Sequence, residues 1–171
     1  MATITSHIVV REAGRAAEWY GRAFGAEIGR RIQVPGGRFM QIELRFGDSQ
    51  VMIADEFPEM GAVSPIALGG TYGALTIATD DADALWRRAL DAGAEVVHAI
   101  EDAFWGERHG QVVDPFGHRW VLPSGSRTCP STRSSDGRRS CSAPPGEGDQ
   151  GAGVAPSASA APGARYAKVR S

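Results

Sequence analysis

The sequence has few cysteines, no long apolar run and no charged leader segment. Its two cysteines, Cys129 and Cys141, have eleven residues between them, which matches neither a zinc site nor a disulfide framework. No run reaches about eighteen apolar residues, the length that a membrane-spanning helix needs. Residues 1–7 do not place a basic segment before an apolar one. We therefore expect a cytoplasmic protein without a membrane partner, in which both thiols are incidental.

Aromatic and large apolar residues are scarce after residue 122. All four Trp and all six Phe precede Pro123, and 31 of the 49 residues from 123 to 171 are Ser, Ala, Gly or Pro. Such a segment cannot bury enough surface to offset the entropy of ordering it. The sequence predicts a domain over 1–122 and a disordered low-complexity tail over 123–171. Because Lys168 is the one Lys beside 17 Arg, translation of a GC-rich gene in a shifted frame is an alternative origin for the tail.

Basic residues are few in the predicted domain. Residues 1–122 contain 11 Arg, no Lys and 17 acidic residues, a net charge of −6, whereas the tail carries 7 basic and 3 acidic residues, a net charge of +4. An acidic domain disfavours nucleic acid as a partner. We expect a small-molecule ligand instead.

The chain does contain a degenerate internal repeat. Six residue types recur seventy positions later: Arg38, Gln41, Ile42, Phe46, Gly47 and Val51 return as Arg108, Gln111, Val112, Phe116, Gly117 and Val121. Upstream, the segment 25–27 (Gly-Ala-Glu) returns at 93–95, an offset of sixty-eight. A repeat of this length indicates a duplicated supersecondary module, and two such modules share one core and one cleft.

Hydrophobic periodicity predicts the order β-α-β-β-β in both halves. The first half has a helical stripe from Ala13 to Phe24, and the second has a helix that begins at Asp81 and ends at Gly93. Strands are predicted near 4–10, 27–34, 38–46, 50–54, 72–79, 95–99, 108–113 and 119–122. The predicted fold is α+β, with module 1 at about 4–56 and module 2 at about 71–122 forming a curled mixed sheet around a cleft. Residues 57–70 are expected to form a loop able to cover a pocket.

Strand alternation assigns side chains to faces. The apolar face of each strand must pack on the helices, so the other face is left for the interior. His7 is then interior, with Thr76 at the equivalent position of module 2. Further interior side chains are expected to be Gln41, Glu43, Val51, His109, Gln111, Arg119 and Val121. An apolar pocket with a few convergent polar groups is typical of small-molecule sites.

Four segments carry a resemblance to a known family. They are 7–11 (His-Ile-Val-Val-Arg), 24–27 (Phe-Gly-Ala-Glu), 105–110 (Trp-Gly-Glu-Arg-His-Gly) and 114–120 (Asp-Pro-Phe-Gly-His-Arg-Trp). Residues 4–122 thereby resemble the glyoxalase/bleomycin-resistance/extradiol-dioxygenase group, the vicinal oxygen chelate superfamily, and within it the branch related to phosphonate-operon proteins. The resemblance implies a paired βαβββ fold, commonly dimeric, and often a divalent metal that chelates two vicinal oxygens of a substrate.

The implied metal ligands come from the first and last strands of each module. Here the last-strand positions hold Val51 and Val121, and the second first strand offers Ala74 or Thr76. His7 is the one remaining candidate ligand, so whether a divalent metal binds is left open.

His7 and Glu43 are the candidate catalytic residues. His7 suits a metal ligand, a general base or a hydrogen-bonded pocket residue. Glu43 suits a general base or an ion pair with Arg119 or Arg45.

The candidate ligand-binding residues are Gln41, Thr76, Trp105, Arg108, His109 and Gln111. Trp105 suits a pocket wall, and the two glutamines suit ligand recognition or a bridge between modules. Arg108 suits an anionic group or a salt bridge to Glu107 or Asp102. By contrast, His98 and His118 are expected at turns or on the surface, and Trp19, Trp86 and Trp120 in the core.

Two function classes remain open from the sequence. One is a lyase, isomerase or dioxygenase that acts on a compound with adjacent oxygens. The other is a non-catalytic homodimer of the bleomycin-resistance type that sequesters a flat ligand, and the acidic domain would favour a cationic one.

Overall fold

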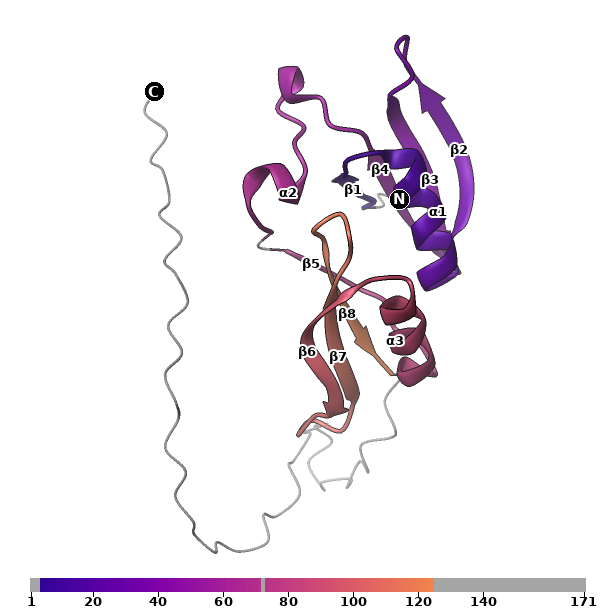
Figure 1. Ribbon diagram of the computed structural model, residues 1–171. Coiled ribbons are helices and arrows are strands. Elements are labelled where there is room, and N and C mark those ends of the chain that lie inside the picture. Colours follow the sequence, from indigo (N-terminus) through magenta and orange to yellow (C-terminus); the bar gives the residue numbers. More distant parts are fainter. Residues whose placement is uncertain (1–3, 72, 125–171) are drawn as a thin grey trace, which may run out of the picture.

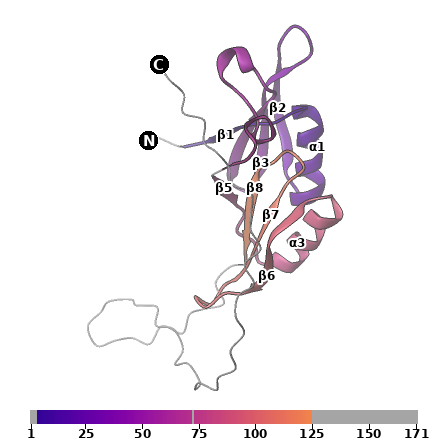
Figure 2. The same ribbon diagram turned by 60° about the vertical axis from the view of Figure 1, so that its left-hand side comes forward.

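The computed structural model describes residues 4–71 and 73–124 of the 171-residue chain. These residues form two four-stranded mixed sheets, each with one long helix packed on it (Figures 1 and 2). The expected tail falls almost entirely outside the described residues, and its disorder stays a prediction. Pro123 still belongs to the last strand and Ser124 bridges to Thr79, so the fold continues past the predicted boundary at 122.

The first module has the predicted order of elements. It contains β1 (Ser6–Val9), α1 (Ala13–Phe24), β2 (Glu27–Gln33), β3 (Phe39–Phe46) and β4 (Ser49–Ala54). The strands are arranged β1-β4-β3-β2, with β1 parallel to β4 and the other pairs antiparallel. The first and last strands of the module are therefore neighbours at one edge of its sheet.

The second module repeats this arrangement. It contains β5 (Ala74–Thr76), α3 (Ala82–Asp91), β6 (Glu95–Asp102), β7 (Arg108–Val113) and β8 (Arg119–Pro123), in the sheet order β5-β8-β7-β6. The α+β class and the β-α-β-β-β duplication are confirmed. The predicted mixed sheet consists of two four-stranded sheets, one in each module. No described helix is long and apolar enough to cross a membrane, and the cytoplasmic location stays a prediction.

Residue types explain where the two long helices begin and end. In α1 the buried stripe is Ala13, Ala16, Ala17, Trp19, Tyr20, Ala23 and Phe24. The carboxylate of Asp55 accepts the Ala13 N–H at 2.6 Å, and Gly25 ends the helix with φ 75°. Asp81 caps α3 by accepting the Ala84 N–H at 2.9 Å, as predicted.

Buried aromatic residues join the two modules. Trp19 of α1 donates through Nε1 to the carbonyl of Ala92 at 2.7 Å. The Tyr20 hydroxyl and the Trp120 indole N–H both donate to Asp114 Oδ2, at 2.7 and 2.8 Å. Burial, and then the neighbouring Asp114 carboxylate, raise the pKa of Tyr20 well above its usual value. The prediction that Trp19, Trp86 and Trp120 belong to the core is confirmed.

The connection between the modules contains two short helices, a 3₁₀ turn η1 (Pro58–Met60) and α2 (Pro65–Leu68). Ser64 caps α2 and is fully buried. Its backbone N–H and its hydroxyl both donate to Glu56 Oε1, at 2.9 and 2.6 Å, and these bonds lower the pKa of Glu56. The connection is thus fixed to the first module rather than being an irregular loop.

Strand register corrects the predicted interior position of Val51. Val51 pairs with Leu44 and is 9% exposed within the core, so it faces helix α1. The turn between β3 and β4 contains two residues, 47–48, whereas the turn between β7 and β8 contains five, 114–118. Alignment through the shared Phe-Gly pair therefore displaced the last strands by three positions.

The same shift changes which residues are equivalent in β1 and β5. Ile8 pairs with Ile53, and Leu75 pairs with Trp120, which fixes the correspondence of these strands. His7 consequently matches Ala74 and not Thr76.

Candidate functional site

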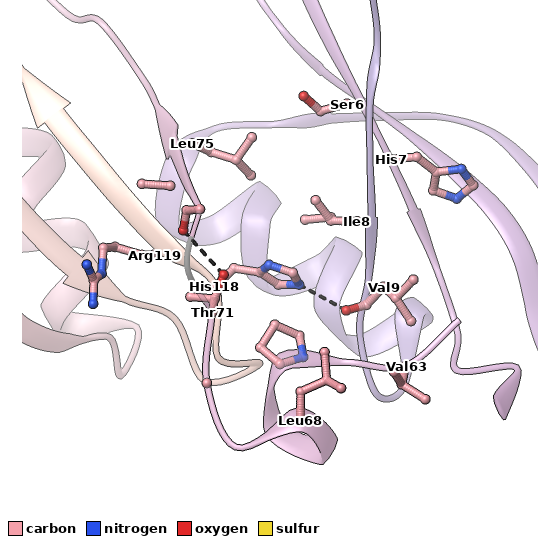
Figure 3. Close-up of a pocket in the computed structure, with 14 residues that line it drawn as sticks. Ser6, His7, Ile8, Val9, Val63, Leu68, Thr71, Leu75, His118 and Arg119 are labelled. Carbon is pink, nitrogen blue, oxygen red and sulfur yellow. Dashed lines mark hydrogen bonds between the residues drawn. The ribbon is translucent and has the colours of Figure 1, made fainter. Parts of the chain in front are cut away.

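A cavity of about 440 Å³ lies between the edge strands β1 and β5 (Figure 3). We call it the seam pocket. Its lining residues are Ser6, His7, Ile8, Val9, Val63, Pro65, Leu68, Gly70, Thr71, Gly73, Ala74, Leu75, His118 and Arg119. They come from β1, the inter-module connection, β5 and the start of β8, so both modules are needed to form the pocket.

The connection forms one wall of the seam pocket, as the sequence suggested for residues 57–70. Val63, Pro65 and Leu68 present apolar side chains to it. Gly117 allows α2 to pack closely against the β7–β8 turn, because it has φ 88° and a Cβ there would lie 3.0 Å from the Pro65 side chain. A larger residue at 117 would displace this wall.

His118 ties the second module to the first. Its Nε2 lies 2.9 Å from the carbonyl oxygen of Val9, and because a carbonyl only accepts, Nε2 carries the proton and donates. The buried Asp114 carboxylate accepts the His118 backbone N–H at 2.9 Å and so fixes the turn that presents this imidazole. We expected His118 at a turn or on the surface, and it does end the turn at 114–118, but its side chain also lines the seam pocket. The sequence signal that could have indicated this contact is its position directly after the Pro-Phe-Gly turn and before the strand that pairs with β5.

Arg119 lies at the β8 end of the seam pocket, across from His7 and Val63 (Figure 3). Its Nε is buried and has no hydrogen-bond partner among the described residues. Its neighbours in register are Ala74 and Val113, whose side chains offer no acceptor. The interior position predicted for Arg119 agrees with this register.

His7 borders the seam pocket but turns away from its centre. Ile8 points toward Leu75 across the pocket, whereas the His7 ring lies on the opposite side of β1 (Figure 3). No hydrogen bond or ion pair of its side chain occurs within residues 4–71 and 73–124. His7 is therefore accessible at the rim, and its catalytic role stays a prediction.

Glu43 lies outside the seam pocket. Arg45 donates to it through Nε at 2.7 Å, and the Glu43 side chain is 13% exposed beside Gly29, where a Cβ would approach it to 3.2 Å. Met52 stands between Glu43 and His7 in register, which separates these two by two strand spacings, about 10 Å. Of the two predicted ion-pair partners, Arg45 is the observed one. The catalytic role of Glu43 stays a prediction.

Most of the predicted ligand-binding residues lie away from the seam pocket. Thr76 and Gln111 flank Val121 on the open face of the second sheet, and Gln41 lies on the open face of the first. Trp105, 46% exposed, donates to Glu107 at 3.1 Å and meets the His109 ring edge-on at 5.5 Å. These side chains do not converge on one cavity in the described structure.

Arg108 forms one of the salt bridges that the sequence left open as the alternative to binding an anion. It shares the helix-facing side of β7 with Val112, and its guanidinium binds both oxygens of Asp83 on α3 as well as Asp102 at 3.2 Å. These hydrogen bonds raise the pKa of Arg108. Strand alternation places Arg108 on this face, because it lies one position from His109, whose side chain is on the other face.

The described residues do not fit the divalent metal that the resemblance implies. Within residues 4–71 and 73–124, no group of three or more His, Cys, Asp or Glu side chains could hold such an ion. With the corrected register, the strand neighbours of His7 and Ala74 are Met52 and Arg119, neither of which suits a hard or borderline cation. We derive no step through a metal.

Three comparisons place the chain among known proteins. An uncharacterized protein of Mycobacterium tuberculosis is 42% identical over 123 residues, which cover 70% of this chain and 72% of that protein. The crystal structure of TioX from Micromonospora sp. ML1 has a TM-score of 0.57 and 25% identity, covering 74% of this chain and 98% of that one. A bleomycin resistance determinant encoded on the transposon Tn5 has a TM-score of 0.53 and 20% identity, covering 75% and 100%, and this likeness shows the fold alone.

The family model agrees with these likenesses. The model described as the Glyoxalase/Bleomycin resistance protein/Dioxygenase superfamily matches residues 2–122, which is the duplicated domain. The narrower branch related to phosphonate-operon proteins stays a prediction. The chain therefore belongs to the glyoxalase/bleomycin resistance protein/dioxygenase superfamily.

Proposed function

We propose that this chain is a small-molecule-binding protein whose ligand occupies the seam pocket. The observation that carries the proposal is the pocket itself, about 440 Å³ in volume, which lies within the usual range for ligand sites. Ile8, Leu68 and Leu75 supply apolar surface that a ligand would remove from water. A binding role of the bleomycin-resistance type agrees with the function that the Tn5 protein carries in its name.

The lining of the seam pocket does not favour the cationic ligand that the net charge of the domain suggested. The acidic residues responsible for the net charge of −6 are spread over the domain, and none of them lines the seam pocket. The ionisable side chains in the lining are His7, His118 and Arg119. A cationic ligand is therefore not part of the proposal.

A pair of tryptophan substitutions on β5 tests the proposal. Ala74 lines the seam pocket, whereas Thr76 is exposed on the same face of the same strand and lies outside the lining. With 1-naphthalenemethanol as a neutral probe, we expect Ala74→Trp to weaken binding about tenfold or more by filling the pocket, and Thr76→Trp to leave it unchanged. Calorimetric titration measures both. Equal affinity of Ala74→Trp and the unsubstituted chain would contradict the proposal.

We also propose a homodimer. The β6–β7 hairpin exposes Val96, Val97, Phe104 and Trp105, with Phe104 82% exposed, and exposed apolar groups of this kind favour association. Sedimentation velocity should give twice the chain mass at micromolar concentration. A chain that stays monomeric throughout the concentration range would refute this.

A further inference from the structure

We infer that the seam pocket selects ligands in which one oxyanion, such as a carboxylate or phosphate, is joined to an apolar body, and that Arg119 binds the oxyanion. This inference rests on the proposed function and adds the chemical class of the ligand. Arg119 lines the outer edge of the pocket, on the face of the second sheet opposite to Leu75, and Ile8 and Leu75 face each other within the pocket (Figure 3). A ligand of this class would place its charge at Arg119 and its apolar part between the two strands.

The charge of Arg119 has no partner in the described part of the chain. Its Nε is buried without an acceptor, which shows that the side chain lies along the protein rather than extending into water. Native structures rarely leave such a donor unsatisfied, because the group has lost its water without gaining a protein partner. A guanidinium is also the group best suited to bind a carboxylate or a phosphate.

Two partly or fully buried carboxylates of the described residues already have other partners. Glu43 is bound by Arg45 at 2.7 Å. Asp114 accepts bonds from the Tyr20 hydroxyl and the Trp120 indole, as well as from two backbone N–H groups. No Asp or Glu occurs among the residues that line the seam pocket. Residues 4–71 and 73–124 thus supply no carboxylate to Arg119, which leaves it able to bind an external anion.

Arg30 and Arg31 on β2 also have no carboxylate partner among the described residues, but both are exposed to water, whereas Arg119 has a buried Nε. Two other arginines on the sheets do have such partners. Arg45 on β3 has Glu43, and Arg108 on β7 has Asp83 and Asp102. Each of these side chains is neutralised by a carboxylate of the same module. Arg119 instead lies at the junction of the modules, where it borders the seam pocket and has no carboxylate partner among the described residues.

Matched naphthalene probes test the inference. They are 1-naphthaleneacetate and 1-naphthyl phosphate as anions, 1-naphthalenemethanol as the neutral probe, and 1-naphthalenemethylamine as the cation. We expect one of the anions to bind about tenfold more tightly than the alcohol, the effect of one charge-assisted hydrogen bond, and the amine to bind most weakly. Whether the acetate or the phosphate binds more tightly identifies the oxyanion.

Substitutions then assign the preference to one side chain. Arg119→Met should bring the ratio of the affinities for the anions and for 1-naphthalenemethanol down to about one, and Arg119→Lys should retain part of the preference for the anion. Arg45→Met removes the same charge outside the pocket and should keep the full preference. Circular dichroism confirms that each variant is folded.

Two results would overturn the inference. One is equal affinity of the unsubstituted chain for the anions and the alcohol, and the other is an anion preference that persists in Arg119→Met. Either result leaves the proposed function standing if Ala74→Trp still abolishes binding of the alcohol. Failure of every probe to bind would refute the proposed function itself.

Discussion

The sheets of the two modules carry similar side chains on the face toward the helix and different side chains on the open face. Toward the helices, the row Ile8, Ile53 and Ile42 of the first sheet corresponds to Leu75, Trp120 and Val112 of the second, and all six are apolar. On the open face, the row His7, Met52 and Glu43 corresponds to Ala74, Arg119 and Val113. Packing on a helix constrains the first face to apolar side chains. The open face carries no such constraint, so it differs in charge and chemistry between the modules.

Asp55 and Asp114 allow the sharpest comparison of the modules. Asp114 is 2% exposed and accepts from Tyr20, Trp120 and two backbone N–H groups, whereas Asp55 accepts the N–H groups of Ala13 and Phe39 in a half-buried site. We expect Asp114→Ala to lower the free energy of unfolding by about 3–5 kcal/mol, because several buried donors lose their acceptor. Asp55→Ala should cost about 1–2 kcal/mol, as loss of a helix cap does.

Urea unfolding of both variants measures the difference. A larger loss for Asp55→Ala than for Asp114→Ala would show that the junction of the modules does not depend on the buried carboxylate.

Gly110 and Met40 occupy equivalent positions on β7 and β3 but have opposite environments. A Cβ at Gly110 would lie 2.7 Å from the ring of Trp86, whereas Met40 is 43% exposed. Gly110→Ala should therefore lower the free energy of unfolding by about 1–3 kcal/mol through overpacking. Met40→Ala should change it by less than about 0.5 kcal/mol. Thermal unfolding of the two variants in parallel checks this, and equal melting temperatures would rule out close packing of Trp86 on β7.

Tyr20 makes the junction of the modules sensitive to high pH. The pKa of Tyr20 is raised in the folded chain and is about 10 in the unfolded chain. Its contribution to the free energy of unfolding is therefore complete below a pH of about 10. The contribution is lost as the pH rises through the higher folded value, since only the unfolded chain releases the proton easily. Tyr20→Phe should cost about 1 kcal/mol at pH 8, and this cost should shrink at pH 11. An equal cost at pH 8 and pH 11 would mean that the ionisation of Tyr20 does not change the stability of the folded chain.

The repeat made the scaffold predictable from the sequence. Each helix and strand depends on residues close together in the sequence. The apolar stripes, the caps at Asp81 and Gly25 and the strand alternation can therefore be recognised without knowing the fold. The register of β4 and β8 could not be read in this way. It depends on the lengths of two turns, and the Phe-Gly pair common to both disguised a difference of three residues.

The site was less predictable because it lies between elements. His7 and Arg119 were expected on interior faces, and both line the seam pocket, where residues 57–70 form one wall. The sequence alone did not identify His118 as a lining residue or Arg119 as a binding residue, because their positions depend on how β8 meets β5 and how the turn at 114–118 approaches β1. For Arg108 the sequence left an anionic ligand and a salt bridge open; the salt bridge to Asp102 was one alternative, and the salt bridge to Asp83 depends on how α3 packs on β7.

We expect the ligand to bind at the edge strands β1 and β5, where the modules meet, rather than around Trp105, His109 and Gln111. The most direct measurement is a titration of the ¹⁵N-labelled chain with 1-naphthaleneacetate, followed by heteronuclear NMR. We predict that the largest amide shifts occur at residues 6–9, 73–75 and 118–119, which line the seam pocket. Largest shifts at Trp105, His109 and Gln111, with the seam pocket unchanged, would contradict the account.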